Sequence, residues 1–232
     1  MIVRDLDHLG YRSTNIDPFA LGVFGTRQLT RHGFPQYLEK LNIRTLNIAA
    51  PDQVHGNRIE VIIKPAGEYQ HIEADGLITS LRHVALSIVT ADCVPLILVD
   101  PVKHLAGISH QGWKGIMAHL PSRMIEQFTR LGSNPTDIRA AIGPSINECC
   151  YEVSRDLWQT FREQFPKSHA LHFVGSRYTI NLQRLVFDQL SAAMPNVHID
   201  HFPFCTKCCK EQFFSYRRGD GTARMLSFII SL

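Results

Sequence analysis

The chain has 232 residues, of which 44% are hydrophobic and 19% are charged, a composition typical of a globular protein with a buried core. Its 24 basic and 21 acidic side chains leave a formal net charge of only +3, without a basic run or a basic and aromatic stripe, so we expect no nucleic-acid partner. The N-terminus carries no apolar signal segment, and the longest apolar run, around 94–99, is too short to span a membrane, so we expect a cytoplasmic protein with no membrane partner.

The sequence contains six cysteines, three of them in the segment 205–209. In a protein without an export signal, cysteines serve as ligands, nucleophiles or core residues more often than as disulfides. No internal repeat, low-complexity tract or linker rich in Gly, Pro or Ser divides the chain. We therefore expect a single domain over residues 1–232, present as a monomer or a homodimer.

Short apolar runs rich in β-branched residues are typical of buried strands. The first four such runs lie at 59–63, 84–90, 94–99 and 105–109. A helical pattern follows, in which apolar residues recur every three or four positions over 116–131, and Gly132 is a natural C-cap. Pro121 lies inside this pattern and should kink the helix or delay its start.

The second half of the chain continues to mix the two kinds of element. A strand is predicted at 138–142, and two helices follow, one capped by Ser154 and one capped by Asn181. Further strands are predicted at 197–201 and 225–230. Strands and helices thus mix without a strict βαβ alternation, which indicates an α/β fold built as a layered sandwich of the α/β or α+β kind.

Three segments share one design, in which an extended apolar stretch ends and a reactive side chain follows beside small residues. His55 follows the stretch 46–51, Cys93 follows the strand 84–90, and His110 stands where the strand 105–109 gives way to a helix. Strand ends hold a side chain on a rigid scaffold and leave it open to solvent.

Two imidazoles and a thiolate suit Zn²⁺, and three protein ligands leave a fourth position for water or substrate, which is the arrangement of catalytic zinc sites. The sequence therefore predicts a zinc centre at His55, Cys93 and His110. From spacing alone, a buried Cys93 with two unrelated histidines remains an open alternative.

Charged side chains elsewhere could take part in binding. Arg27, Arg217 and Arg218 could clamp a phosphate through their guanidinium forks, or could be solvated or structural arginines. Asp75 and Asp92 could support the ligands or act as acid and base groups, and Asp92 could equally hold a turn.

The segment Cys205-Thr-Lys-Cys208-Cys209, with His198 and His201 upstream, could form a second zinc site. One CxxC without a distant matching pair is a weak signal, so reduced thiols near the surface are the favoured interpretation. A multicopper oxidase is not favoured, because the sequence contains no His-x-His pair of the kind that bridges copper ions.

Nine motifs, taken together and in order, make the chain similar to the YfiH-type family, whose members are often labelled polyphenol oxidases or laccase-domain proteins. The motifs begin with Gly25-Thr-Arg27 and end with Arg224-Met-Leu-Ser-Phe228, and between them lie 53–56, 74–79, 90–95, 110–115, 142–146, 149–153 and 213–218. The resemblance implies a layered α/β/α fold related to cysteine hydrolases.

The resemblance also implies an activity, which is phosphorolysis of the purine nucleosides adenosine, inosine and S-methyl-5'-thioadenosine, with adenosine deaminase as a second activity. The zinc ligands and catalytic residues would be His55, Cys93 and His110, and copper could substitute for zinc. The residues expected to bind nucleoside or phosphate are Arg27, Asp75, Arg217 and Arg218. Two cysteines of the 149–153 motif, Cys149 and Cys150, are expected to be packing residues.

The chain departs from the family pattern in three places. Gln111 replaces an alanine beside His110, Ala223 replaces the glycine of a Thr-Gly-Arg motif, and the segment between Arg27 and Gln53 is short. If that segment helps to hold the nucleoside, its shortening affects the substrate range or the affinity.

Two alternatives to the zinc enzyme remain open. In a cysteine hydrolase, Cys93 would be a nucleophile activated by His110 or His55, for example in an amidase that acts on cell-wall precursors. In a non-catalytic binding protein, the same residues would hold a metal without turnover. Protection of Cys93 by metal would favour the zinc enzyme over the cysteine hydrolase.

Overall fold

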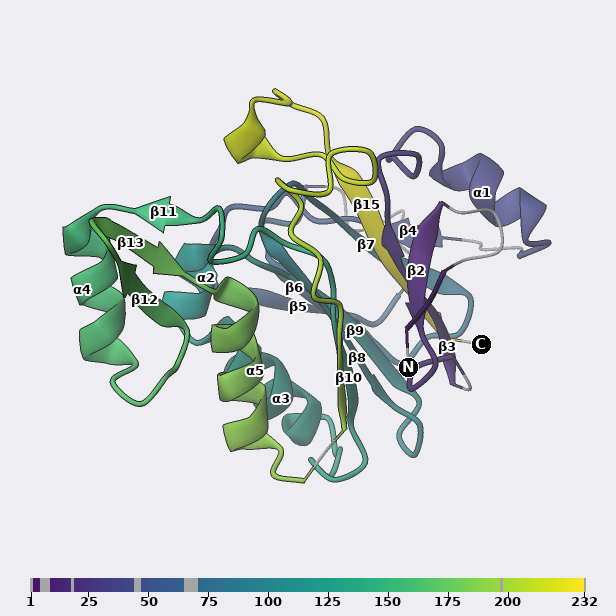
Figure 1. Ribbon diagram of the computed structural model, residues 1–232. Coiled ribbons are helices and arrows are strands. Elements are labelled where there is room, and N and C mark those ends of the chain that lie inside the picture. The colour runs from purple at the N-terminus through teal and green to yellow at the C-terminus, as the bar shows by residue number, and fades with distance from the viewer. Residues whose placement is uncertain are drawn as a thin grey trace.

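The computed structural model describes residues 2–4, 9–17, 19–43, 47–64, 71–196 and 198–231. Within them, two six-stranded sheets stack on one another and a three-stranded sheet lies to one side (Figure 1). The first sheet has the order β1 (Ile2–Arg4), β2 (Gly10–Ser13), β3 (Ala20–Gly25), β15 (Met225–Ser231), β7 (Val84–Thr90) and β4 (Asn47–Ala49). The second sheet has the order β14 (Ile199–His201), β10 (Arg139–Ile142), β8 (Val94–Asp100), β9 (Leu105–Gln111), β6 (Gly76–Thr79) and β5 (Ile59–Ile62). The small sheet has the order β11 (Glu152–Val153), β13 (Arg177–Ile180) and β12 (Leu171–Val174).

An apolar core fills the space between the two large sheets. In β15, Ile229 packs into this core and its neighbour Phe228 packs on the outer face of the first sheet. In β8, Ile97 packs into the same core and Leu96 packs on the outer face of the second sheet. Because successive side chains of a strand point to opposite faces and both faces are covered here, these strands have unbroken apolar sequences.

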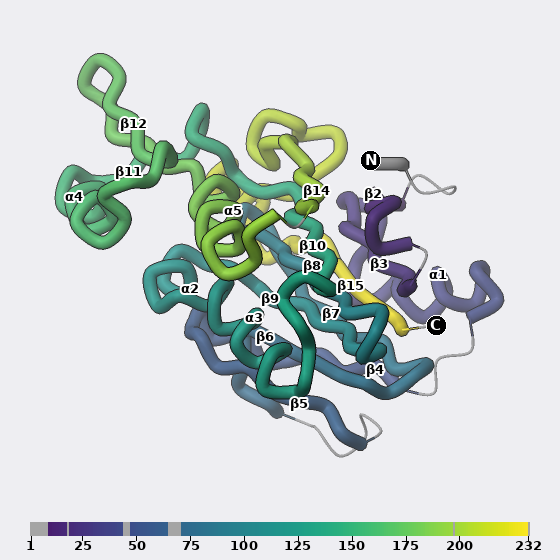
Figure 2. Tube along the Cα trace, turned by 90° about the horizontal axis from the view of Figure 1, so that it is seen from below, coloured from purple at the N-terminus to yellow at the C-terminus, as the bar shows by residue number. Residues whose placement is uncertain are grey.

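Helices cover the outer face of each large sheet. On the first sheet, α1 (Phe34–Lys40) places the rings of Phe34 and Tyr37 4.7 and 5.8 Å from that of Phe228, measured between centroids. The helices on the second sheet are α2 (Trp113–Met117), α3 (Leu120–Arg130) and α5 (Leu182–Ala193), and α4 (Arg155–Gln164) packs on the small sheet. Figure 2 shows α1 on the opposite side of the sheets from α3 and α5.

The layers are therefore helix, sheet, sheet and helix. This mixed α/β sandwich confirms the predicted fold class, but two sheets stand where the resemblance implied one. Most strand pairs are antiparallel, and the parallel pairs are β4 with β7, β5 with β6 and β10 with β14. The absence of a strict βαβ alternation in the sequence reflects this pairing.

The predicted strands are confirmed with ends that shift by at most two residues. They appear as β5, β7, β8, β9, β10 and β15. For the strand predicted at 197–201, β14 covers Ile199–His201, and Val197 lies outside the described residues.

The helical stretch predicted over 116–131 is confirmed, but it is divided in two. The chain forms α2 and α3, and they are separated at His119, which has a left-handed φ of 58°. Pro121 lies in the first turn of α3, where its missing N–H removes no helical hydrogen bond. It therefore delays the start of the helix, which was one of the two predicted effects.

Both predicted N-caps are confirmed. The Ser154 hydroxyl accepts the N–H of Leu157 at 3.2 Å, and the Asn181 side-chain oxygen accepts the N–H of Arg184 at 2.8 Å. Each bond satisfies a backbone donor that has no partner inside the helix. Across the described ranges, no helix is both long and apolar enough to cross a membrane.

The contact between α3 and β9 requires a glycine at position 107. A Cβ atom at Gly107 would lie 2.8 Å from Cε2 of Phe128 and 3.2 Å from Cε of Met124. Gly107→Ala should therefore lower the free energy of unfolding by about 1–3 kcal/mol, the usual cost of overpacking a core, as measured by urea denaturation.

Two further variants test the cause of this loss. Adding Phe128→Leu should recover part of the lost stability, because the smaller side chain makes room for the new methyl group. Gly33→Ala is the matched control, because its nearest neighbours would lie 3.9 Å from the added Cβ. Equal losses in Gly107→Ala and Gly33→Ala would contradict the packing argument.

Candidate functional site

The three reactive side chains predicted from the sequence lie together in the structure. The ligand atoms of His55, Cys93 and His110 are all within 4.8 Å of one another. His55 lies on the connection from β4 to β5, Cys93 on the turn from β7 to β8, and His110 in β9. Since β4 and β7 belong to the first sheet and β5 and β8 to the second, the site forms where two connections cross between the stacked sheets.

Asp75 is a fully buried carboxylate that holds both histidines. Its Oδ1 lies 2.8 Å from Nδ1 of His110 and accepts the backbone N–H of His55 at 3.1 Å. Its Oδ2 accepts the N–H of Gly56 at 2.7 Å and that of Val54 at 3.3 Å. Burial would raise the pKa of Asp75, but the bonds from His110 and the backbone lower it below its ordinary value.

The bond to Asp75 also fixes the tautomer of His110. A carboxylate can only accept, so the imidazole proton lies on Nδ1. Nε2 is then left with its lone pair available to a metal or a proton. With only 2% of its surface exposed, the ring has little freedom to turn away.

The loop that carries His55 is attached to the first sheet by Gln53. The Gln53 amide donates to the carbonyl of Val89 at 2.9 Å and accepts the N–H of Val89 at 2.8 Å. His55 itself has a φ of 59°, a left-handed conformation that is costly for a residue with a side chain. The hydrogen bonds of Gln53 and Asp75 therefore stabilise a loop that would otherwise relax.

Gly112 leaves the space in which the three ligands meet. A Cβ atom at this position would lie 3.1 Å from Cδ2 of His55, 3.5 Å from Cε1 of His110 and 3.7 Å from Sγ of Cys93. A larger side chain would enter the centre of the group, so the sequence has a glycine where α2 begins.

Cys93 and His110 shift the pKa of each other. Burial would raise the pKa of the Cys93 thiol, but His110 and His55 lower it to about 6. Burial would lower the pKa of His110, but the Cys93 thiolate and Asp75 raise it to about 9. Without a metal, the two groups are therefore a thiolate and an imidazolium at neutral pH.

Asp92 holds the turn in front of Cys93, which is the structural role that the sequence left open for it. Its φ is 89°, and its carboxylate accepts three hydrogen bonds from the C-terminal part of the chain. The donors are the hydroxyls of Thr206 at 2.6 Å and Ser215 at 3.1 Å and the N–H of Arg217 at 2.8 Å. Asp92 thereby ties the ligand turn to the loop that precedes β15.

The side chains of His55, Cys93 and His110 open onto a cavity of about 670 Å³, which is within the range of pockets that bind small molecules. Its walls carry three arginines, Arg31, Arg217 and Arg224, and three large aromatic side chains, Trp113, Tyr151 and Tyr216. A group of cations beside aromatic rings suits a ligand that combines an anion with a planar base.

Of the residues predicted to bind nucleoside or phosphate, Arg217 lines this cavity. Its guanidinium lies 4.8 Å from the ring centroid of Tyr151 and donates to the carbonyl of Glu152 at 2.8 Å. Asp75 lies behind His110 and does not line the cavity, so its contacts in the structure are with the histidines rather than with a ligand.

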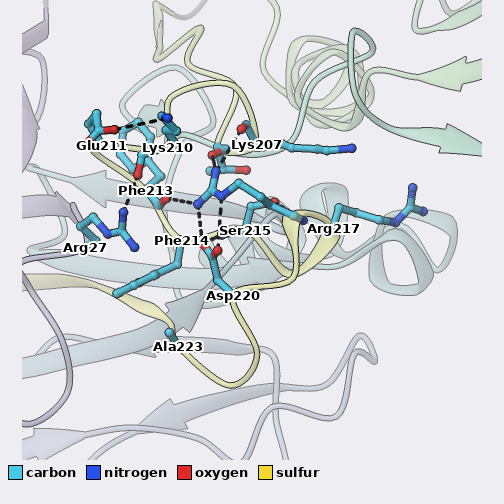
Figure 3. A network of polar contacts seen from close by, with 12 residues as sticks. Arg27, Lys207, Lys210, Glu211, Phe213, Phe214, Ser215, Arg217, Asp220 and Ala223 are labelled. Atoms are coloured by element: carbon cyan, nitrogen blue, oxygen red, sulfur yellow. Dashed lines mark hydrogen bonds and ion pairs between the residues drawn. The ribbon is translucent and has the colours of Figure 1, made fainter.

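Arg27, which follows β3, lies against Lys210 and Phe214 of the C-terminal loop (Figure 3), and Arg218 belongs to that loop. Arg218 donates to the carbonyls of Thr206, Lys207 and Phe213 at 2.9, 3.0 and 2.6 Å. Arg27 donates to the carbonyl of Lys210 at 2.6 Å. Neither lines the cavity, and the phosphate contact predicted for them stays a prediction.

Gln111 does not face the site, although it follows His110 directly. It is fully buried, and its amide donates to the hydroxyl of Ser109 at 2.7 Å. Residues 109 and 111 share the face of β9 that is opposite to His110. This departure from the family pattern therefore leaves the surroundings of the three ligands unchanged.

Sequence reasoning did not single out four of the cavity residues, Arg31, Arg224, Tyr151 and Tyr216. Arg224, Tyr151 and Tyr216 lie inside three of the nine motifs, and this position in the sequence could have indicated that they belong to the site. Arg31 lies in the short segment between Arg27 and Gln53, which matches no motif, so the shortened segment still reaches the cavity.

Several known proteins are similar to this chain in sequence and in fold. Purine nucleoside phosphorylase YlmD of Bacillus subtilis (strain 168) is 37% identical over 193 residues, which are 77% of this chain and 68% of that protein. Adenosine deaminase RL5 of an unknown prokaryotic organism is 29% identical over 192 residues, which are 77% of this chain and 72% of that protein. The crystal structure of the hypothetical protein YfiH of Bacillus licheniformis has a TM-score of 0.88 at 27% identity and covers 98% of both chains.

Residues 20–231 match the family described as multi-copper polyphenol oxidoreductase laccase. This match spans nearly the whole chain, and the similar proteins carry the names YlmD and YfiH. The chain therefore belongs to the YfiH and YlmD group of the laccase and polyphenol oxidase family, as its nine motifs indicated.

Proposed function

We propose that this protein is a zinc-dependent purine nucleoside phosphorylase that acts on adenosine, inosine and S-methyl-5'-thioadenosine and also deaminates adenosine. The observation that carries the proposal is the group His55, Cys93 and His110 at a cavity whose wall holds three arginines. The names of YlmD and RL5 support the same two activities. The six free cysteines support a reducing, cytoplasmic setting.

The donor set fits a catalytic metal. One thiolate and two imidazoles are ligands that zinc accepts together, and three of them leave a position open toward the cavity. A zinc ion held by His55, Cys93 and His110 would supply Lewis acidity toward the oxygen nucleophile, phosphate or water. Asp75 supports this role by holding the His110 ring and the His55 backbone in place.

Zinc fits the site better than copper, although copper could occupy it. A blue-copper centre has two histidines, one cysteine and a weak axial methionine, and no methionine lines this cavity. In the described ranges, the other candidate metal group contains four cysteines and no histidine. A cluster of several copper ions bridged by histidines therefore has no set of ligands here.

The arginines explain how the cavity would select phosphate. Arg31, Arg217 and Arg224 place three cations on its wall. Two carboxylates also line the cavity, of which Asp92 already accepts three hydrogen bonds and Asp52 lies 3.4 Å from Nδ1 of His71. Guanidinium groups match the oxygens of phosphate in geometry and charge. A bound phosphate would stabilise the positive charge that develops on the sugar as the bond to the purine breaks.

A cysteine hydrolase is the second candidate, because Cys93, His110 and Asp75 form a thiolate, imidazolium and carboxylate chain. In that enzyme, the metal-free protein would be the active form, and Cys93 would become acylated. An amide of a cell-wall precursor is a substrate of this class.

The activity is tested by incubating zinc-loaded protein with adenosine, with and without phosphate, and separating the products. We expect adenine and ribose 1-phosphate only when phosphate is present, and inosine in both cases. Cys93→Ala should lower phosphorolysis roughly 1,000-fold, because losing a Lewis acid removes several kcal/mol of transition-state stabilisation. Cys209→Ala is the matched control, since Cys209 does not line the cavity. If the zinc-loaded protein released no purine product, the phosphorylase would be excluded and the cysteine hydrolase favoured.

Arg217→Ala tests phosphate binding. Loss of one charge-assisted contact, worth roughly 1.5–3 kcal/mol, should raise the KM for phosphate about 10- to 100-fold and change the KM for adenosine much less. Arg184→Ala is the control, because Arg184 pairs with Asp188 on α5, outside the cavity. An unchanged KM for phosphate in Arg217→Ala would remove this residue from the binding site.

Asp75→Asn tests how the ligands are held. Both oxygens of Asp75 accept hydrogen bonds, so an amide NH₂ in their place would meet another donor. We expect zinc affinity to fall about 10- to 100-fold, as for other supporting partners of zinc ligands, in a competition titration with a chelator. Asp100→Asn is the control, because Asp100 is also buried but its Oδ2 has no hydrogen-bond partner. Equal zinc affinity in the two variants would show that Asp75 does not support the ligands.

The reactivity of Cys93 separates the two candidate enzymes. In metal-free protein, alkylation by iodoacetamide should rise with pH around a midpoint of about 6, because the thiolate is the nucleophile and its pKa is lowered. His110→Gln should move this midpoint upward, toward the ordinary thiol value of about 8.5. In the phosphorylase, zinc should protect Cys93 at neutral and higher pH, where the metal stays bound. A midpoint above 8 in the unmodified protein would contradict the pairing of Cys93 with His110.

A further inference from the structure

Four cysteines from two distant segments meet outside the cavity. Cys149 and Cys150 follow β10, and Cys205 and Cys208 follow β14. Their sulfur atoms all lie within 4.8 Å of one another, with 3.7 Å from Cys149 to Cys208 and 3.4 Å from Cys150 to Cys208. In the sequence, the CxxC of Cys205 and Cys208 has no matching CxxC. In the fold, Cys149 and Cys150 provide the second pair of thiols.

The two histidines upstream of the CxxC do not join this cluster. His198 is bonded to Asp200 at 2.8 Å, and His201 is bonded to the side-chain oxygen of Gln183 at 2.8 Å. Cys149 and Cys150 were expected to be packing residues. This interpretation is incomplete, because Cys149 is exposed and its sulfur faces that of Cys208.

The spacing of the sulfur atoms is compatible with a tetrahedral thiolate site. Four sulfurs bound to zinc at about 2.3 Å lie about 3.8 Å from one another, whereas a disulfide joins two sulfurs at about 2.05 Å. The four cysteines are free thiols, and the distances from Cys208 to Cys149 and to Cys150, 3.7 and 3.4 Å, are close to the spacing in a zinc site. Four thiolates also fill the coordination of zinc, which is the closed arrangement of structural sites.

The backbone around Cys205 is arranged to receive a thiolate. The backbone N–H groups of Asn147 and Cys208 point to its sulfur. The two segments are already joined at this point, since Thr206 donates its N–H to the carbonyl of Ser145 at 3.0 Å. The ligands therefore lie on a preformed turn rather than on loose chain.

We propose that Cys149, Cys150, Cys205 and Cys208 form a second metal site, which binds zinc as four thiolates and fastens the C-terminal loop to the segment 143–151. Each thiol releases its proton to solvent as its sulfur binds the metal. The site is structural, since no position is left open for a substrate.

The position of this second site links it to the cavity. Ile146 and Tyr151 line the cavity from one of the joined segments. Thr206, next to Cys205 on the other segment, donates its hydroxyl to Asp92 beside Cys93. A cation at the four cysteines thereby restrains the two segments on either side of the turn that carries Cys93. It does so without contact to a molecule bound in the cavity.

Metal content tests the proposal on the full-length protein. We expect two zinc ions per chain in the unmodified protein and one in the double variant Cys149→Ser, Cys208→Ser. Cys209→Ser is the matched control and should keep two, because Cys209 is adjacent in sequence but outside the cluster. Cys93→Ala should keep the zinc of the four cysteines and lose the other, so the two sites are counted separately.

The zinc count tests the four-cysteine site separately from the catalytic zinc site proposed above. One zinc that survives Cys93→Ala and disappears in the double variant would support the second site and contradict the catalytic one. One zinc that disappears in Cys93→Ala and survives in the double variant would overturn the second site.

A measurement on the unmodified protein covers the case in which the double variant does not fold. Cys149 and Cys208 are exposed, so without a metal they should react with iodoacetamide. We expect them to be protected until a chelator is added, and amide exchange in 143–151 and 205–218 to become faster at the same time. Labelling at full rate before the chelator, or protection that only a reductant removes, would overturn the proposal, the latter in favour of a disulfide.

Discussion

The carboxylate of Asp75 is the interaction on which the site depends. It bonds one histidine through the ring and the other through the backbone, so a single buried charge fixes two ligands that are 55 residues apart in the chain. The backbone carbonyl of Asp75 also accepts the N–H of His110 at 2.7 Å. This bond between the segment before β6 and strand β9 holds the His110 ring beside the Asp75 carboxylate. A buried charge is costly unless it is paired, and four donors to Asp75 offset that cost.

The stacked sheets determine where this interaction can form. A short connection between the two sheets joins strand ends that lie at the same edge of the sandwich. The connections that carry His55 and Cys93 both cross at this edge and lie side by side. The first sheet contributes Val89, which holds Gln53, and the second contributes His110. The ligands are thus fixed by two rigid layers, whereas the cavity wall that faces them is built mainly from loops.

The grouping of His55, Cys93 and His110 could be predicted from the sequence because each lies near the end of an apolar strand or shortly after one, and a strand end is a local signal. The caps at Ser154 and Asn181 were predictable for the same reason. The strand Ala20–Gly25 was not, since its sequence ALGVFG contains two glycines and little β-branched character. The number of sheets was also hidden, because the same alternation of elements is compatible with one sheet or with two.

The roles of the arginines could not be read from the sequence, because they depend on contacts between distant segments. Arg217 and Arg218 are neighbours in one motif, yet one lines the cavity and the other donates to three backbone carbonyls. The cysteine cluster was hidden in the same way, since 58 residues separate Cys150 from Cys208. Adjacent residues can take such different roles wherever a turn of the backbone points one side chain to the cavity and the next side chain to the protein interior.

The C-terminal loop shows why a second cation site is useful in this fold. Between residues 205 and 224, Phe213 is the one fully buried large apolar side chain, and Phe214 and Cys209 are partly buried against the same core, so the hydrophobic effect holds this segment at few points. Hydrogen bonds to Asp92 and from Arg218 supplement it, but each contributes only about 0.5–3 kcal/mol, since water competes for the same groups. A cation held by four thiolates would restrain the segment at its first residues with a far stronger set of bonds. The loop could then present Arg217 and Tyr216 to the cavity with Phe213 as its one fully buried large apolar side chain.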